Sequence, residues 1–350
     1  MIPPSGHRPI SSKPNFFILG APKCGTSSMA AWLGQHPAIF IPAMKEPNFF
    51  NTDDNQGPIY GVTALDAYET LFAAATAAQP AVGEASALYL SSAIAVSNIL
   101  RYQPDARFIV MLRNPVEMAP AWHAEMLILG LENVRDFRAA WDFQRDRRRG
   151  RHVPALSGSW RRLFFYADVC ALGTQLQRLF AAVPHDRVLI VLLDDVVADP
   201  RREYLRALRF LGVNDDCRRQ FPVYNSARVI RSPRLTRALF LAIRLKEQLG
   251  IRLILDLWRR VSAWNVVAAS RDSLPPAVTD TLREHFANGI SLLSHLLDRD
   301  LRHWLEPPGS GYPCVSDRAM TFTQISEAAS KRQCDTREPM KVVARGGARP

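Results

Sequence analysis

Short apolar runs alternate along this chain with segments of helical periodicity. The apolar runs predict strands at 15–20, 38–41, 80–85, 107–112 and 188–193. The periodic segments predict helices at 26–34, 64–78 and 92–102, and a last helix from Pro276 to about Trp304. Buried strands that alternate with helices are typical of a parallel sheet with helical crossover connections. The pattern therefore predicts an α/β fold, with a parallel sheet flanked by helices.

The two ends of the chain depart from this pattern. Residues 1–14 are rich in Pro and Ser, which predicts a loose leader. Residues 306–350 are polar, rich in Arg and without an apolar period, so we expect a disordered tail beyond a domain at 15–305. Within that domain, residues 235–262 predict amphipathic helices that cover the sheet or an acceptor groove. Peripheral contact of these helices with a membrane surface is the alternative.

Composition and charge narrow the classes of partner. The chain has 350 residues, 47% of them hydrophobic, which is enough for one large domain. A net charge of +11 favours anionic partners. The basic residues are scattered and accompany no nucleic-acid motif, so nucleic acid is not an expected partner. The arginine cluster between Arg145 and Arg162 is interpreted as a solvated loop, with an acceptor or lipid-head-group site as the alternative.

Cysteine and histidine spacing gives no sign of a metal. The five cysteines form no CxxC pair and the eight histidines show no metal spacing, so neither a zinc site nor a disulfide framework is predicted. The N-terminus lacks a signal pattern, and no apolar run approaches the length of a membrane span. We therefore expect a cytoplasmic protein.

The most informative segment is the loop PKCGTSS at 22–28, directly after the first predicted strand. Backbone N–H groups at a helix start bind phosphate, helped here by Lys23, Gly25 and the hydroxyls of Thr26, Ser27 and Ser28. The spacing is not the G-x-x-x-x-G-K-[ST] of an ordinary nucleotide P-loop. Cys24 is interpreted as a small residue that lets the backbone approach phosphate, because a nucleophilic role would need a base beside it.

Two further segments follow predicted strands. In KEPNFF at 45–50, Glu46 is an exposed carboxylate after the strand at 38–41, and ligands of parallel sheets gather at the carboxyl ends of strands. In RNPVEMAPA at 113–121, Arg113 follows the strand at 107–112 and can bind a phosphate through its forked guanidinium. Glu84 and Ser86 lie at another strand end and are expected to position loops. His123 is expected to be structural.

Together these segments resemble sulfotransferases of the bacterial and heparan-sulfate type, which use 3′-phosphoadenylyl sulfate (PAPS). Residues 22–28 are similar to the family's 5′-phosphosulfate loop, 45–50 to its K-E-P-H-[FY]-F segment, and 113–121 to its R-N-P-x-x-R-A-x-S signature. The resemblance is to a divergent member, because Asn48, Met118 and Ala121 replace the family's His, second Arg and Ser.

The resemblance implies a P-loop-type fold with PAPS as co-substrate and no metal. It implies that residues 23–28 and Arg113 bind the donor, and that Arg228 and Arg231 are candidates for the segment that closes over the 3′-phosphate. Lys23 would stabilise the leaving phosphate while Glu46 takes the proton of an acceptor hydroxyl or amine. The acceptor class stays open among glycans, lipids and small molecules.

Two other functions are kept as alternatives. A non-catalytic nucleotide-binding protein is suggested by the three departures from the family pattern, but the presence of both Lys23 and Glu46 argues against it. A P-loop phosphotransferase that uses ATP is disfavoured by the missing Walker spacing and by the lack of an evident Asp for Mg²⁺.

Overall fold

The computed structural model describes residues 13–53, 61–154, 158–224, 228–232, 235–236, 238–239, 241–242, 264–268 and 274–306. The chain divides into two units, Met1–Glu306 and Pro307–Pro350, and every described residue belongs to the first. Most of the predicted leader, most of the amphipathic segment at 235–262 and the predicted tail beyond Glu306 therefore lie outside the described residues.

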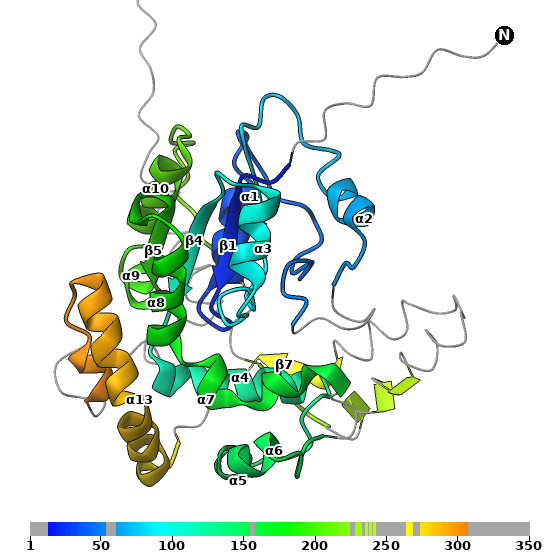
Figure 1. Ribbon diagram of the computed structural model, residues 1–350, viewed down its shortest axis with the longest axis vertical. Coiled ribbons are helices and arrows are strands. Elements are labelled where there is room, and N and C mark those ends of the chain that lie inside the picture. Colours follow the sequence, from blue (N-terminus) through cyan, green and yellow to red (C-terminus); the bar gives the residue numbers. More distant parts are fainter. Residues whose placement is uncertain are drawn as a thin grey trace, which may run out of the picture. The chain divides into compact units, whose positions relative to one another are not determined.

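A five-stranded parallel sheet forms the centre of the first unit (Figure 1). Its strands are β1 (Phe16–Gly20), β2 (Ile39–Phe40), β3 (Ala81–Ala85), β4 (Arg107–Leu112) and β5 (Val188–Leu192). Their order is β2-β3-β1-β4-β5, and all four pairings are parallel. All of β1 and β3, and all but the first residue of β4, are buried, because helices cover both faces of the sheet. The predicted α/β fold is confirmed.

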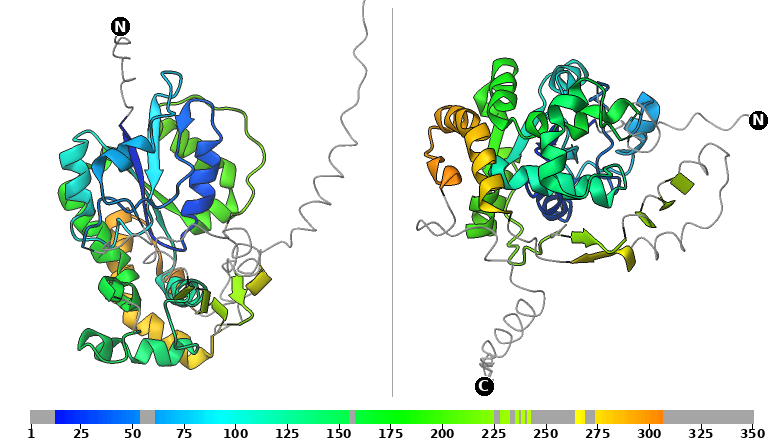
Figure 2. Two further views of the ribbon diagram at one scale, coloured as in Figure 1. Left: turned by 90° about the vertical axis from the view of Figure 1, so that its right-hand side faces the viewer. Right: turned by 90° about the horizontal axis from the view of Figure 1, so that it is seen from below.

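Helices alternate with the strands and pack on both faces of the sheet. The α-helices are α1 (Thr26–Gly34), α2 (Leu65–Thr70), α3 (Ala95–Tyr102), α4 (Pro115–Ile128), α5 (Phe137–Asp142), α6 (Gln144–Arg148), α7 (Tyr166–Val169), α8 (Leu172–Ala182), α9 (Leu193–Ala198), α10 (Pro200–Leu211) and α13 (Pro276–Leu297). Short 3₁₀ helices lie at Gly158–Phe164, His185–Arg187 and Arg302–Leu305. Helix α1 contacts α10 on one face, and α3 contacts α8 on the other (Figure 2, left).

The strand predictions agree with the structure to within two residues, but several helices are shorter than predicted. The helix predicted at 64–78 ends at Thr70, and the Gln79 side chain then accepts from the Thr76 N–H and closes a turn. The helix predicted at 92–102 begins only at Ala95, because the Ser92 hydroxyl accepts the Ala95 N–H before it. The last helix ends at Leu297, where Asp298 adopts a left-handed conformation.

The predicted segments meet at the carboxyl edge of the sheet, because all five strands run in the same direction. Because the strands are parallel, the loops that follow β1, β3 and β4 lie at one edge. Helix α4 begins at this edge with Asn114 as its N-cap, whose side chain accepts from the Val116 N–H at 2.9 Å. The short antiparallel pair β6 (Arg228–Ile230) and β7 (Val266–Ala268) lies in contact with α4 through β6.

The basic cluster is not simply solvated, so that interpretation is wrong for its central residue. The Arg147 side chain is fully buried and forms a 2.8 Å ion pair with Glu132, which is equally buried. The Tyr166 hydroxyl donates to the same carboxylate at 2.5 Å. Arg148 and Arg162 lie on the surface in ion pairs with Asp168 and Asp53. The buried pair ties the 144–148 helix to the chain that follows α4.

Among the described helices, none is both long enough and apolar enough to span a membrane.

Candidate active site

The loop after β1 has the backbone geometry of an anion cradle. Gly25 is the N-cap of α1 in a left-handed conformation with φ 88°, and no side chain caps the helix. The Ser28 N–H donates to the Gly25 carbonyl at 3.0 Å, and the start of a helix, where the N–H groups and the helix dipole are directed outward, favours an anion. A Cβ atom at Gly25 would lie 3.1 Å from the Leu193 side chain, and a side chain would in addition be strained at this φ.

The Cys24 side chain points from the loop into the core and is a neutral thiol. Its Sγ atom is buried and lies 3.9 Å from the Met118 Sδ atom. Burial raises the pKa of the Cys24 thiol to about 12, although the nearby Arg113 charge acts in the opposite direction. Met118, at the position of the family pattern's second Arg, therefore supports the loop through apolar packing and supplies no charge.

The loop hydroxyls have different partners. Ser28 accepts the Tyr224 N–H at 3.0 Å and so connects the start of α1 to a segment almost two hundred residues later. Thr26 is buried. The Ser27 hydroxyl accepts from the Lys45 ammonium at 2.8 Å, so this hydroxyl faces the segment that carries Glu46.

Two cations of the site are paired with carboxylates of α4. The Lys23 Nζ atom lies 2.8 Å from a Glu125 carboxylate oxygen, and both side chains are mostly buried. The Arg113 guanidinium donates to Glu117 at 2.6 Å and approaches the Lys23 carbonyl oxygen at 3.5 Å. The structure thus brings Lys23 and Arg113 together.

Sequence reasoning did not find Glu117 and Glu125. Glu117 follows Arg113 by four residues and lies in the first turn of α4, and Glu125 follows it by eight, about two turns further along the same helix. That spacing was the available signal. It requires recognising the Asn-Pro pair at 114–115 as a helix start, and Pro at the first helical position is typical of one.

Glu46 lies on a loop that is anchored to β3 and to the segment after it. The Glu46 N–H donates to the Ala85 carbonyl at 3.0 Å, and the Asn48 N–H donates to the Ser86 hydroxyl at 3.2 Å. Glu46 and Asn48 both have positive φ, at 59° and 49°. The Asn48 side chain donates to the Glu46 carbonyl at 3.0 Å, so the residue that replaces the family's His holds the turn.

A buried carboxylate beneath this loop organises its hydrogen bonds. Glu84 accepts from the hydroxyls of Tyr89, Ser86 and Tyr68 at 2.8, 2.9 and 3.1 Å. The Tyr89 hydroxyl in turn accepts from the Phe49 N–H at 3.0 Å. Burial raises the pKa of Glu84 to about 7, although the three hydroxyl donors act to lower it. These contacts agree with the expected loop-positioning role of Glu84 and Ser86.

The two loops meet through one side chain. The Lys45 ammonium donates to the Ser27 hydroxyl at 2.8 Å and to the Glu46 carboxylate at 2.7 Å. The loop at 22–28 and Glu46, which lie on separate segments of the sequence, therefore lie side by side at the carboxyl edge of the sheet.

The remaining candidates are not joined to this cluster by any described contact. Arg231 is exposed, and its guanidinium carbon lies 5.1 Å from the centre of the Trp264 ring. Among the described residues, no hydrogen bond or ion pair joins Arg231 to the loops at 22–28 and 45–50. Arg228 lies in β6, but its side chain is outside the described part of the structure. His123 is buried and donates to the Val134 carbonyl at 2.8 Å, which is a structural role.

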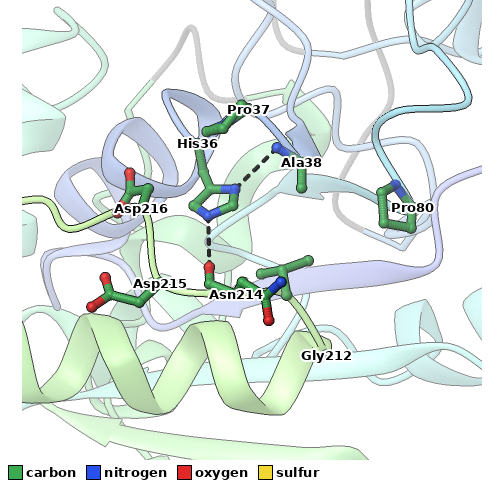
Figure 3. Close-up of a pocket in the computed structure, with 9 residues that line it drawn as sticks. His36, Pro37, Ala38, Pro80, Gly212, Asn214, Asp215 and Asp216 are labelled. Carbon is green, nitrogen blue, oxygen red and sulfur yellow. Dashed lines mark hydrogen bonds between the residues drawn. The ribbon is translucent and has the colours of Figure 1, made fainter. Parts of the chain in front are cut away.

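A separate cavity of about 330 Å³ opens at the opposite, amino edge of the sheet. Pro80 and Ala38, which immediately precede β3 and β2, line it. Figure 3 shows the His36 ring between two backbones: it accepts the Ala38 N–H at 3.0 Å and donates to the Asn214 carbonyl at 2.9 Å. Ligands of such sheets bind at carboxyl ends, so this cavity is not the candidate site. In the described part of the chain, no cluster of His, Cys, Asp or Glu is arranged to hold a metal ion.

Comparison with known proteins points to one family. Residues 13–222 match the family model described as the sulfotransferase domain. A crystal structure of a sulfotransferase from Alicyclobacillus acidocaldarius aligns over 84% of this chain and 100% of its own, with a TM-score of 0.62 and 26% identity.

Two curated relatives align over parts of the chain. Carbohydrate sulfotransferase 15 of Mus musculus is 28% identical over 151 residues, which cover 32% of this chain and 27% of that protein. The bifunctional heparan sulfate N-deacetylase/N-sulfotransferase 2 of Bos taurus is 25% identical over 236 residues, covering 64% of this chain and 25% of that protein. The similarity thus spans about a quarter of each relative.

Proposed function

This chain belongs to the sulfotransferase domain family, and from that premise we propose that it transfers a sulfuryl group from PAPS to an acceptor hydroxyl or amine. The observation that carries the proposal is the convergence of the loop at 22–28 with Glu46, which Lys45 joins through hydrogen bonds of 2.8 and 2.7 Å. A transfer site needs a cradle for the leaving phosphate and a base for the acceptor on either side of the transferred group.

The residues present suit a donor with several negative charges. Lys23 and Arg113 each hold a carboxylate oxygen, at 2.8 and 2.6 Å, and so already have the geometry to bind an oxyanion. The uncapped start of α1 adds backbone N–H groups beside them. We propose that phosphate oxygens join or displace Glu125 and Glu117 at these two cations. Arg228 and Arg231 remain candidates for the 3′-phosphate.

The proposed roles divide between two residues. When bound, PAPS supplies a sulfuryl group attached to a phosphate that is a good leaving group. Lys23 and the N–H groups at the start of α1 would hold the charge that develops on that phosphate. Glu46 would accept the acceptor's proton through the carboxylate oxygen that does not contact Lys45, and general-base catalysis of this kind contributes roughly 10²–10⁴-fold.

For the acceptor we propose a glycan. The relatives' names support this, since one is a carbohydrate sulfotransferase and the other acts on heparan sulfate. Lipid and small-molecule acceptors are the other classes to include in the test panel.

The test combines donor binding with transfer. Calorimetry without divalent metal should show that PAPS and adenosine 3′,5′-bisphosphate bind more tightly than ATP, and labelled PAPS should deliver sulfate to at least one member of the acceptor panel. Lys23→Ala should weaken donor binding and abolish turnover. Glu46→Gln should retain donor affinity while turnover falls by roughly 10²-fold or more.

Three results would contradict the proposal. Equal affinity for ATP and the bisphosphate would refute the donor, and donor binding without transfer to any acceptor would favour a non-catalytic binding protein. Wild-type turnover in Glu46→Gln would remove Glu46 as the base.

A further inference from the structure

Lys45 has a position that the roles above do not use. Its ammonium touches both the loop at 22–28, through Ser27 at 2.8 Å, and the candidate base Glu46, at 2.7 Å. The Ser27 hydroxyl oxygen and the Glu46 carboxylate oxygen both accept from the Lys45 ammonium, so they lie no more than about 5.5 Å apart, the sum of the two hydrogen-bond lengths. Lys45 therefore bridges the gap in which the transferred group must lie.

The chemistry of the step defines what occupies this gap. As the acceptor oxygen or nitrogen bonds to sulfur, its proton passes to Glu46. The bond from sulfur to the phosphate oxygen breaks, and its electron pair stays on the phosphate. Of the atoms of PAPS, the sulfuryl oxygens would lie between the phosphate, held by the loop at 22–28, and the acceptor, next to Glu46. A cation at this point would face those oxygens.

The residue type and its surroundings fit such a contact. Only Lys13, Lys23 and Lys45 are lysines among the described residues, and the last two both lie at the site. Lys45 is about one-third exposed, and in the described part of the chain its ammonium is bonded to Ser27 of α1 and to the adjacent Glu46. A lysine ammonium is a compact and mobile point charge with three donors, which can leave Ser27 for a ligand oxygen.

We infer that Lys45 is a further catalytic residue, which binds the sulfuryl oxygens of the donor. This inference rests on the proposed function, and it assigns to Lys45 a part of the donor that Lys23 does not hold. The two lysines then divide the phosphosulfate between them: Lys23 binds the phosphate that leaves, and Lys45 binds the group that is transferred.

The test compares two ligands that differ by the sulfuryl group. Calorimetry with PAPS and with adenosine 3′,5′-bisphosphate should be carried out on the wild type, Lys45→Met, Lys45→Arg and Lys23→Ala. Lys45→Met should weaken PAPS binding by roughly tenfold or more, the usual size of a lost charge-assisted hydrogen bond, and leave the bisphosphate within about twofold. Lys45→Arg should recover part of the loss. Lys23→Ala should weaken both ligands.

Lys13→Met is the matched control, because Lys13 lies over the Tyr102 ring at 4.6 Å, on the amino side of β1. It should bind both ligands as the wild type does. An equal loss of both ligands in Lys45→Met would overturn the inference and assign Lys45 to the phosphate. Unchanged binding of both with reduced turnover would also overturn it, leaving Lys45 as a residue that positions Glu46. Failure of the wild type to bind PAPS would instead refute the donor assignment itself, and with it this role.

Discussion

Replacing Glu84 by Gln should change how the stability of this protein depends on pH. The Glu84 carboxylate is fully buried and accepts three hydroxyl hydrogen bonds beneath the loop that carries Glu46. Burial raises its pKa from an ordinary value of 4.5 to about 7, despite the hydroxyl donors. The folded state therefore holds this proton more tightly than the unfolded chain does.

The sign and size of the effect follow from that difference. A raised pKa stabilises the folded state fully below pH 4.5, and this contribution is lost as the pH rises through 7. Each pKa unit is worth about 1.4 kcal/mol, so the wild type should lose about 3 kcal/mol of unfolding free energy, most of it between pH 5 and 7. Glu84→Gln cannot titrate and should lack this loss.

The substitution also has a cost that does not depend on pH. Protonated Glu84 has one O–H donor among these hydroxyls, whereas the glutamine amide has two N–H donors, so the substitution should lower the free energy of unfolding by about 1–2 kcal/mol. At pH 5 the variant should therefore be less stable than the wild type. By pH 8 the difference should shrink or reverse in the variant's favour.

Urea unfolding at several pH values between 5 and 8 measures both the pH-dependent loss and the pH-independent cost. Subtracting the unfolding free energy of the variant from that of the wild type removes the titration of all unchanged groups. Glu284→Gln, an exposed carboxylate on α13, is the control and should show a constant difference. If Glu84→Gln also differs from the wild type by a constant amount across this range, Glu84 does not titrate as argued and its burial does not dominate its pKa.

Two further predictions concern burial elsewhere. Glu132→Gln or Arg147→Met removes one partner of an ion pair that is completely buried, and should lower the unfolding free energy by about 3–5 kcal/mol in urea titrations. Arg148→Met, in an ion pair that is half exposed, should cost no more than about 1 kcal/mol, and equal losses would contradict the burial argument. In native protein at pH 8, iodoacetamide should modify the exposed Cys217 and spare Cys24, because burial raises the pKa of the Cys24 thiol to about 12. Peptide mass spectrometry measures both rates, and equal rates would exclude a buried Cys24.

Local sequence was sufficient for the strands and for the candidate loops. The strands β1 and β4 are buried along nearly their whole length, so each had to be a continuous apolar run that could be recognised in isolation. The loop at 22–28 depends on Gly25 and on the residues that flank it, which are adjacent in the chain. Parallel strands then place whatever follows them at one edge, so Lys23, Glu46 and Arg113 could be grouped before their positions were known.

Helix ends were less predictable, because competing hydrogen bonds determined them. The Ala-rich segment after Thr70 has helical composition, yet the N–H groups of Leu71, Phe72 and Ala73 donate to carbonyls three residues back instead of four, so the α-helix ends there. Helix propensity differs by only tenths of a kcal/mol between such residues, so a few competing hydrogen bonds, such as these turns or the Ser92 cap before α3, decide where a helix begins or ends.

Only the tertiary structure decided which charges face one another. Glu125 lies 102 residues from Lys23, and Ser28 lies 196 residues from Tyr224, so no local pattern connects either pair. The burial of Arg147 was equally unpredictable from local sequence, because Arg147 belongs to a basic run but lies in the interior beside Glu132. A charge's partner and its exposure depend on the packing of distant segments, whereas an apolar run and a glycine turn depend on neighbours in the chain. The sequence by itself therefore determined the strands, the cradle and the chemical types at the site, and the folded chain determined how those groups are paired.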